Sequence, residues 1–183
     1  MNQLAGQVRC ILRRLVGEGA SEIAEAALVM PLAFMILLGI YWFGRAFNTY
    51  STMNDAAREG ARVALGQTCA TCATPNGAPP LSAISSAVTQ VMNASSVDPN
   101  AISAYTPAGI AFCPGATQAA NCSVDGKNIT LCTQVQLTPP SSSQQVCGVS
   151  VSFQYPYQFW LPFTSLNMQR ITLSTNVQMT GEY

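Results

Sequence analysis

Residues 26–44 read AALVMPLAFMILLGIYWFG, nineteen consecutive positions without a charged side chain. A helix needs about 20 apolar residues to cross a bilayer. A core helix of a soluble protein is amphipathic, whereas this stretch is apolar all round. Glu25 directly precedes it and Arg45 directly follows it. The stretch therefore predicts a membrane-spanning helix, which Pro31 should bend or loosen because proline removes one backbone donor.

Charged side chains are scarce in this 183-residue chain and are concentrated around the apolar stretch. They make up 9% of the residues, balance to a net charge of zero, and eleven of the sixteen lie within the first 62 positions. A neutral chain without a basic run is not typical of a nucleic-acid binder. The chain has no histidine, which excludes Ser/His/Asp triads, Cys/His dyads and His-ligated metal sites. We therefore expect a protein that is not an enzyme, with no cofactor, no metal and no nucleic-acid partner.

The cysteines predict on which side of the membrane each end lies. Three arginines precede the span and three follow it within residues 45–62, so the basic residues do not decide the orientation. Cys10 precedes the span, and six cysteines follow it. The six are Cys69, Cys72, Cys113, Cys122, Cys132 and Cys147. An even number in a Ser/Thr/Pro/Gly-rich region indicates disulfides in an oxidising compartment, so we expect the N-terminal leader inside the cytoplasm and the C-terminal region outside.

Sequence alone does not choose the disulfide pairs. The spacing favours a short loop between Cys113 and Cys122 and a link between Cys132 and Cys147, while the other connectivities stay open. Cys69 and Cys72 form a CxxC motif, but thioredoxin-type chemistry needs that motif at a helix N-terminus after a strand. Here it follows a long helix. We expect a structural loop disulfide or two separate bridges, with a thiol oxidoreductase or a zinc ribbon as the less favoured interpretations.

The apolar helix is expected to continue outward to about residue 65. No proline interrupts residues 45–65, and Tyr50, Met53, Ala57, Ala61 and Ala64 recur at intervals of three or four. The small side chains on this stalk permit close approach of another element. We expect the sheet of the same chain to cover them, with a helix of another chain as the alternative. Charged residues on the other side should form a solvated surface with local Glu/Arg pairing.

The region after residue 65 is expected to be a small antiparallel sheet domain. Apolar residues lie on one face of a helix over 81–92. Strands are predicted at about 129–137, 146–155 and 171–180, the last two from strict alternation of apolar and polar residues. The fold class is therefore α+β, a long N-terminal membrane-spanning helix that continues as a stalk and packs on a disulfide-linked antiparallel sheet.

The N-terminal residues also carry a family resemblance. Residues 17–64 read GEGASEIAEAALVMPLAFMILLGIYWFGRAFNTYSTMNDAAREGARVA. The order of Glu25, the apolar residues 28–32, the FGR at 43–45 and the AAREGAR at 56–62 resembles the TadE/TadG-like minor pilin family of the Tad (Flp) pilus system. The C-terminal segments 149–163 and 171–183 resemble the family's closing pair more weakly.

The resemblance implies processing by a prepilin peptidase on the cytoplasmic side of the inner membrane. Cleavage after Gly17 puts Glu22 fifth in the mature chain, the usual pilin spacing. Cleavage after Gly19 puts Glu25 sixth, and Glu25 is the glutamate that the family-like apolar run follows. Both sites stay open. The glutamate is expected to pair with the amine of a neighbouring subunit, or otherwise to lie solvated at the positive end of the helix dipole.

The resemblance further implies a division into a cleaved leader at 1–19, a transmembrane and stalk helix at 20–65, and an exported cysteine-rich β domain at 66–183. It implies a single-pass inner-membrane protein that assembles through its N-terminal helix with lipid, the major pilin and other minor pilins. The expected role is assembly, initiation or tip structure of the pilus. The alternative is a membrane-anchored, exported, adhesin-like binding module.

One aromatic stretch is open to two interpretations. It comprises Phe153, Tyr155, Tyr157, Phe159, Trp160 and Phe163. We expect it to pack in the core against the stalk. The alternative is an interface with a neighbouring pilin or with lipid headgroups.

Overall fold

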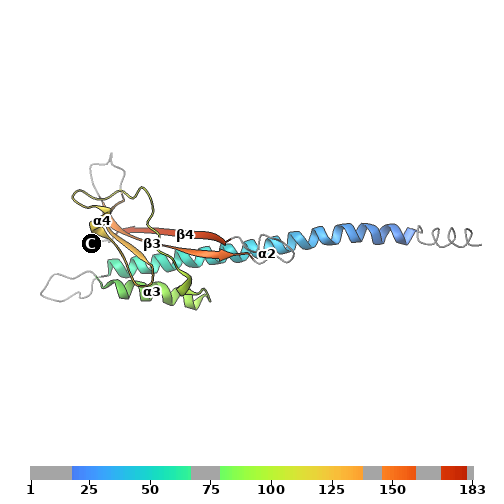
Figure 1. Ribbon diagram of the computed structural model, residues 1–183, viewed down its shortest axis with the longest axis horizontal. Coiled ribbons are helices and arrows are strands. Elements are labelled where there is room, and N and C mark those ends of the chain that lie inside the picture. Colours follow the sequence, from blue (N-terminus) through green and yellow to red (C-terminus); the bar gives the residue numbers. More distant parts are fainter. Residues whose placement is uncertain (1–17, 67–78, 138–145, 160–169, 181–183) are drawn as a thin grey trace, which may run out of the picture. The chain divides into compact units, whose positions relative to one another are not determined.

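The structure, a computed structural model, describes residues 18–66, 79–137, 146–159 and 170–180 (Figure 1). Its contacts divide the chain into two compact units, Met1–Gly44 and Arg45–Tyr183. The boundary falls inside helix α2, which spans Glu18–Leu65. Each unit is therefore described by itself.

The first unit is described from residue 18 onward, and all of that part is helical. Its residues are mostly Ala, Leu, Met, Ile and Phe, and the helix continues through Pro31. A membrane helix tolerates such a proline because neighbouring groups can satisfy the freed carbonyl. The expected helix from the leader to about residue 65 is confirmed for its described length.

In its described residues, the second unit contains the end of α2 and three shorter helical elements. They are α3 (Leu81–Ala94), the 3-10 helix η1 (Pro99–Ala101) and α4 (Gln118–Asn121). Helix α3 begins after Pro80, whose extended backbone suits a residue that precedes a helix. Ile84, Val88 and Met92 lie on its buried face, which confirms the helix predicted over 81–92.

A four-stranded antiparallel sheet completes the second unit. Its strands lie in the order β1 (Cys122–Val124), β2 (Thr130–Gln136), β3 (Cys147–Gln158) and β4 (Arg170–Thr180). The three strands predicted at about 129–137, 146–155 and 171–180 are confirmed. Strand β1 was not predicted, because three residues are too few to establish a period.

Strand β3 runs past the point at which the sequence predicted it to end. It continues through Pro156, which pairs with Thr172 of β4. The backbone of Gln154 bonds to Ser103, on the side of β3 away from β4. Because backbone groups alternate between the two sides of a strand, the missing N–H of Pro156 also lies on that side. The proline therefore removes no bond of the β3–β4 ladder.

The core lies between the helices and one face of the sheet. It joins three groups of buried side chains: Met53, Ala56, Ala57 and Ala61 of α2, Ile84, Val88 and Met92 of α3, and Val149, Val151 and Phe153 of β3. The three alanines are fully buried. The expectation that the small face of the stalk packs within the same chain is therefore confirmed.

A segment that sequence reasoning missed crosses the other face of the sheet. This strap, residues 103–113, begins where Ser103 pairs with Gln154 and ends where Phe112 pairs with Val135. Between these points the hydroxyl of Ser152 donates to the carbonyl of Tyr105, with an oxygen–oxygen distance of 2.8 Å. Ser150 and Ser152, which alternation places on this face, are consequently buried.

The disulfides differ from the pairs that the spacing favoured. The bonds join Cys113 to Cys147 and Cys122 to Cys132. Pairing of Cys113 with Cys122 and of Cys132 with Cys147 is therefore wrong. Cys122 and Cys132 are direct partners in the β1–β2 ladder, with Cα atoms 4.0 Å apart. Cys69 and Cys72 lie outside the described residues.

Candidate functional site

The outer surface of α2 before residue 48 is apolar and exposed. Phe34, Phe43 and Phe47 are 63%, 72% and 73% exposed, and the aliphatic side chains around them are exposed to a similar extent. Soluble monomers rarely expose a contiguous apolar patch larger than a few hundred Å². Among the described residues, one helix, over Glu25–Leu65, is long and apolar enough to cross a membrane by length and composition. This surface fits a single-pass membrane anchor.

The glutamates expected to act in assembly lie at the start of this surface. Glu25 is exposed, and Gly19 and Glu22 are part of α2. Glu22 and Glu25 are three positions apart in the sequence of this helix. Gly17 lies outside the described residues. The choice between the two cleavage sites stays a prediction.

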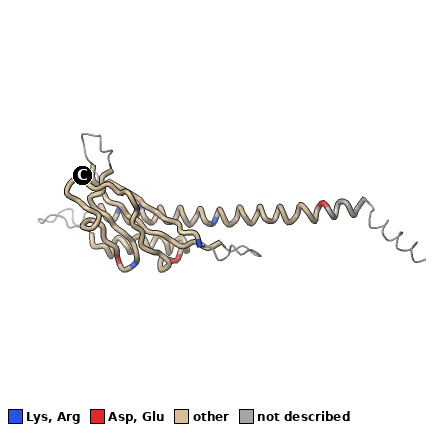
Figure 2. Tube along the Cα trace, turned by 45° about the horizontal axis from the view of Figure 1, so that its top comes forward, with Lys and Arg blue, Asp and Glu red and all other residues tan. Residues whose placement is uncertain are grey.

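Neighbouring charged side chains form ion pairs on the stalk. Figure 2 shows how sparse the charged residues are along the chain. A guanidinium nitrogen of Arg58 lies 3.7 Å from Oδ1 of Asp55, and one of Arg62 lies 3.9 Å from Oε2 of Glu59. All four side chains are exposed. Pairs at this helical spacing stabilise a helix by about 0.2–0.5 kcal/mol. The local pairing expected on this side of the stalk is confirmed.

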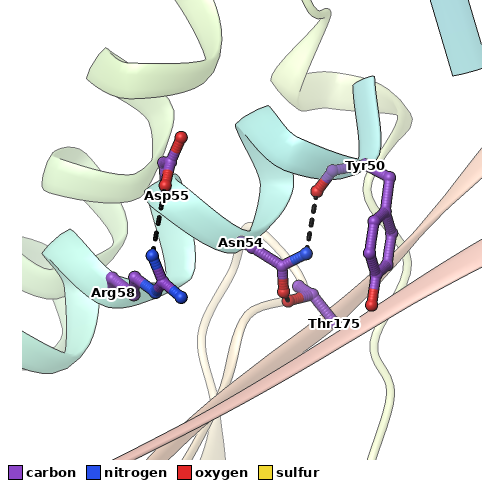
Figure 3. A network of polar contacts seen from close by, with 5 residues as sticks. All are labelled: Tyr50, Asn54, Asp55, Arg58 and Thr175. Carbon is purple, nitrogen blue, oxygen red and sulfur yellow. Dashed lines mark hydrogen bonds and ion pairs between the residues drawn. The ribbon is translucent and has the colours of Figure 1, made fainter. Parts of the chain in front are cut away.

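A polar contact joins the stalk to the last strand (Figure 3). The hydroxyl of Thr175 in β4 donates to Oδ1 of Asn54 at 2.7 Å, and Nδ2 of Asn54 donates to the carbonyl of Tyr50 at 3.0 Å. Thr175 is 2% exposed, so its hydroxyl needs a partner. Sequence reasoning missed this pair. Its one signal in the sequence was the polar Asn54 next to Met53, just before the small residues of the stalk.

The C-terminal half of β3 packs beside the start of the stalk. Phe153 and Tyr157 are buried and Tyr155 packs against the core, which confirms core packing for these three aromatic residues. The ring of Phe159 lies 5.1 Å from that of Tyr157, edge to face. Trp160 and Phe163 lie outside the described residues.

Tyr155 has an altered acidity. Burial raises the pKa of the Tyr155 hydroxyl above its usual value of 10.0, and the negative charge of Asp98 raises it further. A backbone hydrogen bond at Asp98 and the positive charge of Arg45 act in the opposite direction. The hydroxyl of Tyr155 therefore lies within electrostatic reach of Arg45, the first residue of the second unit.

Within the described ranges, no group of three or more His, Cys, Asp or Glu side chains is placed to hold a metal ion. The functional surfaces that the structure does define are the exposed apolar helix and the disulfide-linked α+β unit that follows it.

These features define a class of protein in which an N-terminal apolar helix of membrane-spanning length is followed by a small α+β domain. We call the part of this domain after the stalk, from residue 66 onward, the head. Within that class, residues 19–62 match the family described as TadE-like protein. The match runs along α2 from the first turn to its final turn and confirms the resemblance expected from the sequence. No curated protein and no solved structure matches the chain.

Proposed function

We propose that this chain is a minor pilin of a Tad/Flp-type pilus, held in the inner membrane by α2 with its disulfide-linked unit exported. Its role is in assembly, initiation or tip structure of the pilus. The observation that carries this proposal is the TadE-like match over residues 19–62, the same helix whose apolar surface is exposed. The TadE-like family is a pilus-associated structural one, which supports an assembly role rather than catalysis.

The proposed partners follow from the start of α2. A prepilin peptidase removes the leader after Gly17 or Gly19, and the new amine and a glutamate then become available for pairing. A carboxylate at the edge of hydrocarbon costs on the order of 3 kcal/mol unless it is paired. Pairing of Glu22 or Glu25 with the amine of a neighbouring pilin removes that cost, so the pair favours assembly with the major pilin and other minor pilins.

The processing step is tested by expressing the full chain with and without the prepilin peptidase and sequencing the mature N-terminus. We expect the chain to begin at Glu18 or Ala20 when the peptidase is present and at Met1 when it is absent. The variants Gly17→Val and Gly19→Val, each alone, identify the site, because only the one at the cut should block processing. A chain that begins at Met1 under both conditions contradicts the processing proposal.

A second experiment separates an assembly role from a simple anchor. Residues 20–44 are replaced by an unrelated membrane span of equal length, while the stalk and head stay unchanged. We expect the exchanged chain to reach the membrane and form both described disulfides, but piliation to be lost. Normal piliation with the exchanged span would support a membrane-anchored binding module instead.

A further inference from the structure

The end of the β3–β4 hairpin lies level with the first residue of the stalk. The contact between Thr175 and Asn54 fixes β4 against α2. Arg170 precedes Thr175 by five strand residues, a rise of about 17 Å. Arg45 precedes Asn54 by nine helical residues, a rise of about 14 Å. Both views in Figures 1 and 2 show β4 running along α2.

A second observation shows which end of β4 lies beside the start of the stalk. Tyr155 pairs with Leu173, which lies between Thr175 and Arg170 on β4. The charge of Arg45 acts on the hydroxyl of Tyr155. The start of β4 and the start of the stalk therefore lie at the same end of the second unit.

Apolar and basic side chains are exposed at this end. Ile171 belongs to the same face of β4 as Leu173 and Thr175, yet it is 47% exposed because the helix-covered core ends before it. Arg170 beside it is exposed. On α2, Phe47 is 73% exposed. A mixture of aliphatic, aromatic and arginine side chains is typical of the boundary between lipid headgroups and acyl chains.

The sequence places a membrane boundary at this level. Arg45 follows directly on residues 26–44, which carry no charge. We propose that Arg170 and Ile171, at the start of β4, contact the phospholipid headgroup layer beside Phe47. This inference rests on the proposed membrane anchor. The guanidinium of Arg170 binds lipid phosphate, and Ile171 lies at the apolar boundary.

The inference is tested with the full chain in vesicles of phosphatidylethanolamine and phosphatidylglycerol. The photo-crosslinker p-benzoylphenylalanine is incorporated in separate samples at positions 171, 178 and 34, and the adducts are identified by mass spectrometry. Gln178 is the control for distance, since it is exposed on the other face of the same strand about 23 Å from Ile171. Phe34 lies in the middle of the apolar run and reports on the anchor itself.

We expect phospholipid adducts at 34 and 171 and none above background at 178. Arg170→Glu should lower the lipid adduct yield at 171 about fivefold, because an arginine near an anionic membrane surface contributes about that factor in affinity. Lipid adducts at 34 but not at 171, or only protein adducts at 171, overturn this inference and leave the anchor intact. The absence of lipid adducts at 34 overturns the anchor and this inference together.

Discussion

Gly60 shows how a single residue sets the distance between two helices. A Cβ atom at this position of α2 would lie 2.6 Å from Cγ2 of Val88 in α3 and 3.5 Å from Cγ1 of Val151 in β3. Glycine is unfavourable inside a helix by about 1 kcal/mol relative to alanine. Its presence in α2 is explained by the close approach of α3 and the sheet, which any side chain would prevent.

Gly60→Ala is therefore expected to destabilise the protein, although alanine favours helix. The clash falls on a buried β-branched side chain that has little freedom at χ1. Overpacking of this kind costs about 1–3 kcal/mol, so we expect a net loss on the order of 1 kcal/mol in chemical denaturation of the full chain in detergent micelles. Gly126→Ala is the matched control because a Cβ there would meet nothing within 4 Å. Adding Val88→Ala should relieve the clash, and simple additivity of the two changes would contradict this explanation.

The Tyr155 hydroxyl predicts a dependence of stability on alkaline pH. The folded state raises its pKa, first through burial and then through Asp98, so the folded state holds the proton more tightly than the unfolded chain does. The stabilisation is fully present below pH 10 and is lost as pH rises through the folded pKa. Tyr155→Phe should therefore flatten the loss of stability above pH 10, as followed by circular dichroism. Parallel pH profiles of the two proteins would show that this hydroxyl does not contribute.

At the level of elements, the two disulfides close loops of different length in the second unit. Cys113 and Cys147 are 34 residues apart, and Cys122 and Cys132 are 10 apart. The chain-entropy relation assigns about 4 kcal/mol to the longer loop and about 3 kcal/mol to the shorter one. The longer bond also holds the end of the strap against the first residue of β3.

The double variant Cys113→Ala/Cys147→Ala should therefore lose about 1 kcal/mol more stability than Cys122→Ala/Cys132→Ala. Denaturant midpoints of both variants and the parent chain, each in micelles, provide the measurement. Each double variant is the control for the other, since both replace two cysteines and remove one disulfide. A larger loss for the pair Cys122 and Cys132 would contradict the loop-length argument.

The elements also show what sequence could and could not predict. Helices α2 and α3 and strands β2, β3 and β4 were predicted because their apolar patterns are local, as in the continuous apolar run of residues 26–44 and the alternation of Val149, Val151 and Phe153. The strap was missed because its pairings with Gln154 and Val135 depend on residues far along the chain. The disulfide pairs were wrong for the same reason. The pairing of Cys122 with Cys132 depends on the register of two strands, and β1 has no pattern of its own.

At the level of the whole molecule, the stalk and the head belong to the same compact unit, Arg45–Tyr183. The buried stalk side chains, the helix α3 and the sheet face all belong to Arg45–Tyr183. Most large apolar side chains of the first unit are exposed between Ile23 and Phe43. The first unit therefore contributes the surface for lipid or for other helices, while the second has the hydrophobic core that a domain needs to fold.

A chain that begins at Arg45 is expected to fold without detergent. Its disulfides, mapped by mass spectrometry, should include Cys113–Cys147 and Cys122–Cys132, and circular dichroism should show one cooperative thermal transition. The matched control starts at residue 66, which removes the stalk and its four core residues. We expect that shorter chain to aggregate, since its sheet face and α3 lose their cover. If both chains fold equally well, the conclusion that the stalk forms part of the hydrophobic core of the second unit is wrong.

The two disulfides are nested, which has a consequence for biogenesis. The bond between Cys122 and Cys132 lies inside the loop closed by Cys113 and Cys147. Cys122 is nine residues from Cys113 and ten from Cys132, so random oxidation of an emerging chain has almost no entropic preference between the right and the wrong bond. Only the β1–β2 ladder selects the right one, and Cys147 arrives last. We therefore expect some mispaired bonds to form early and to be exchanged for the native pair during maturation.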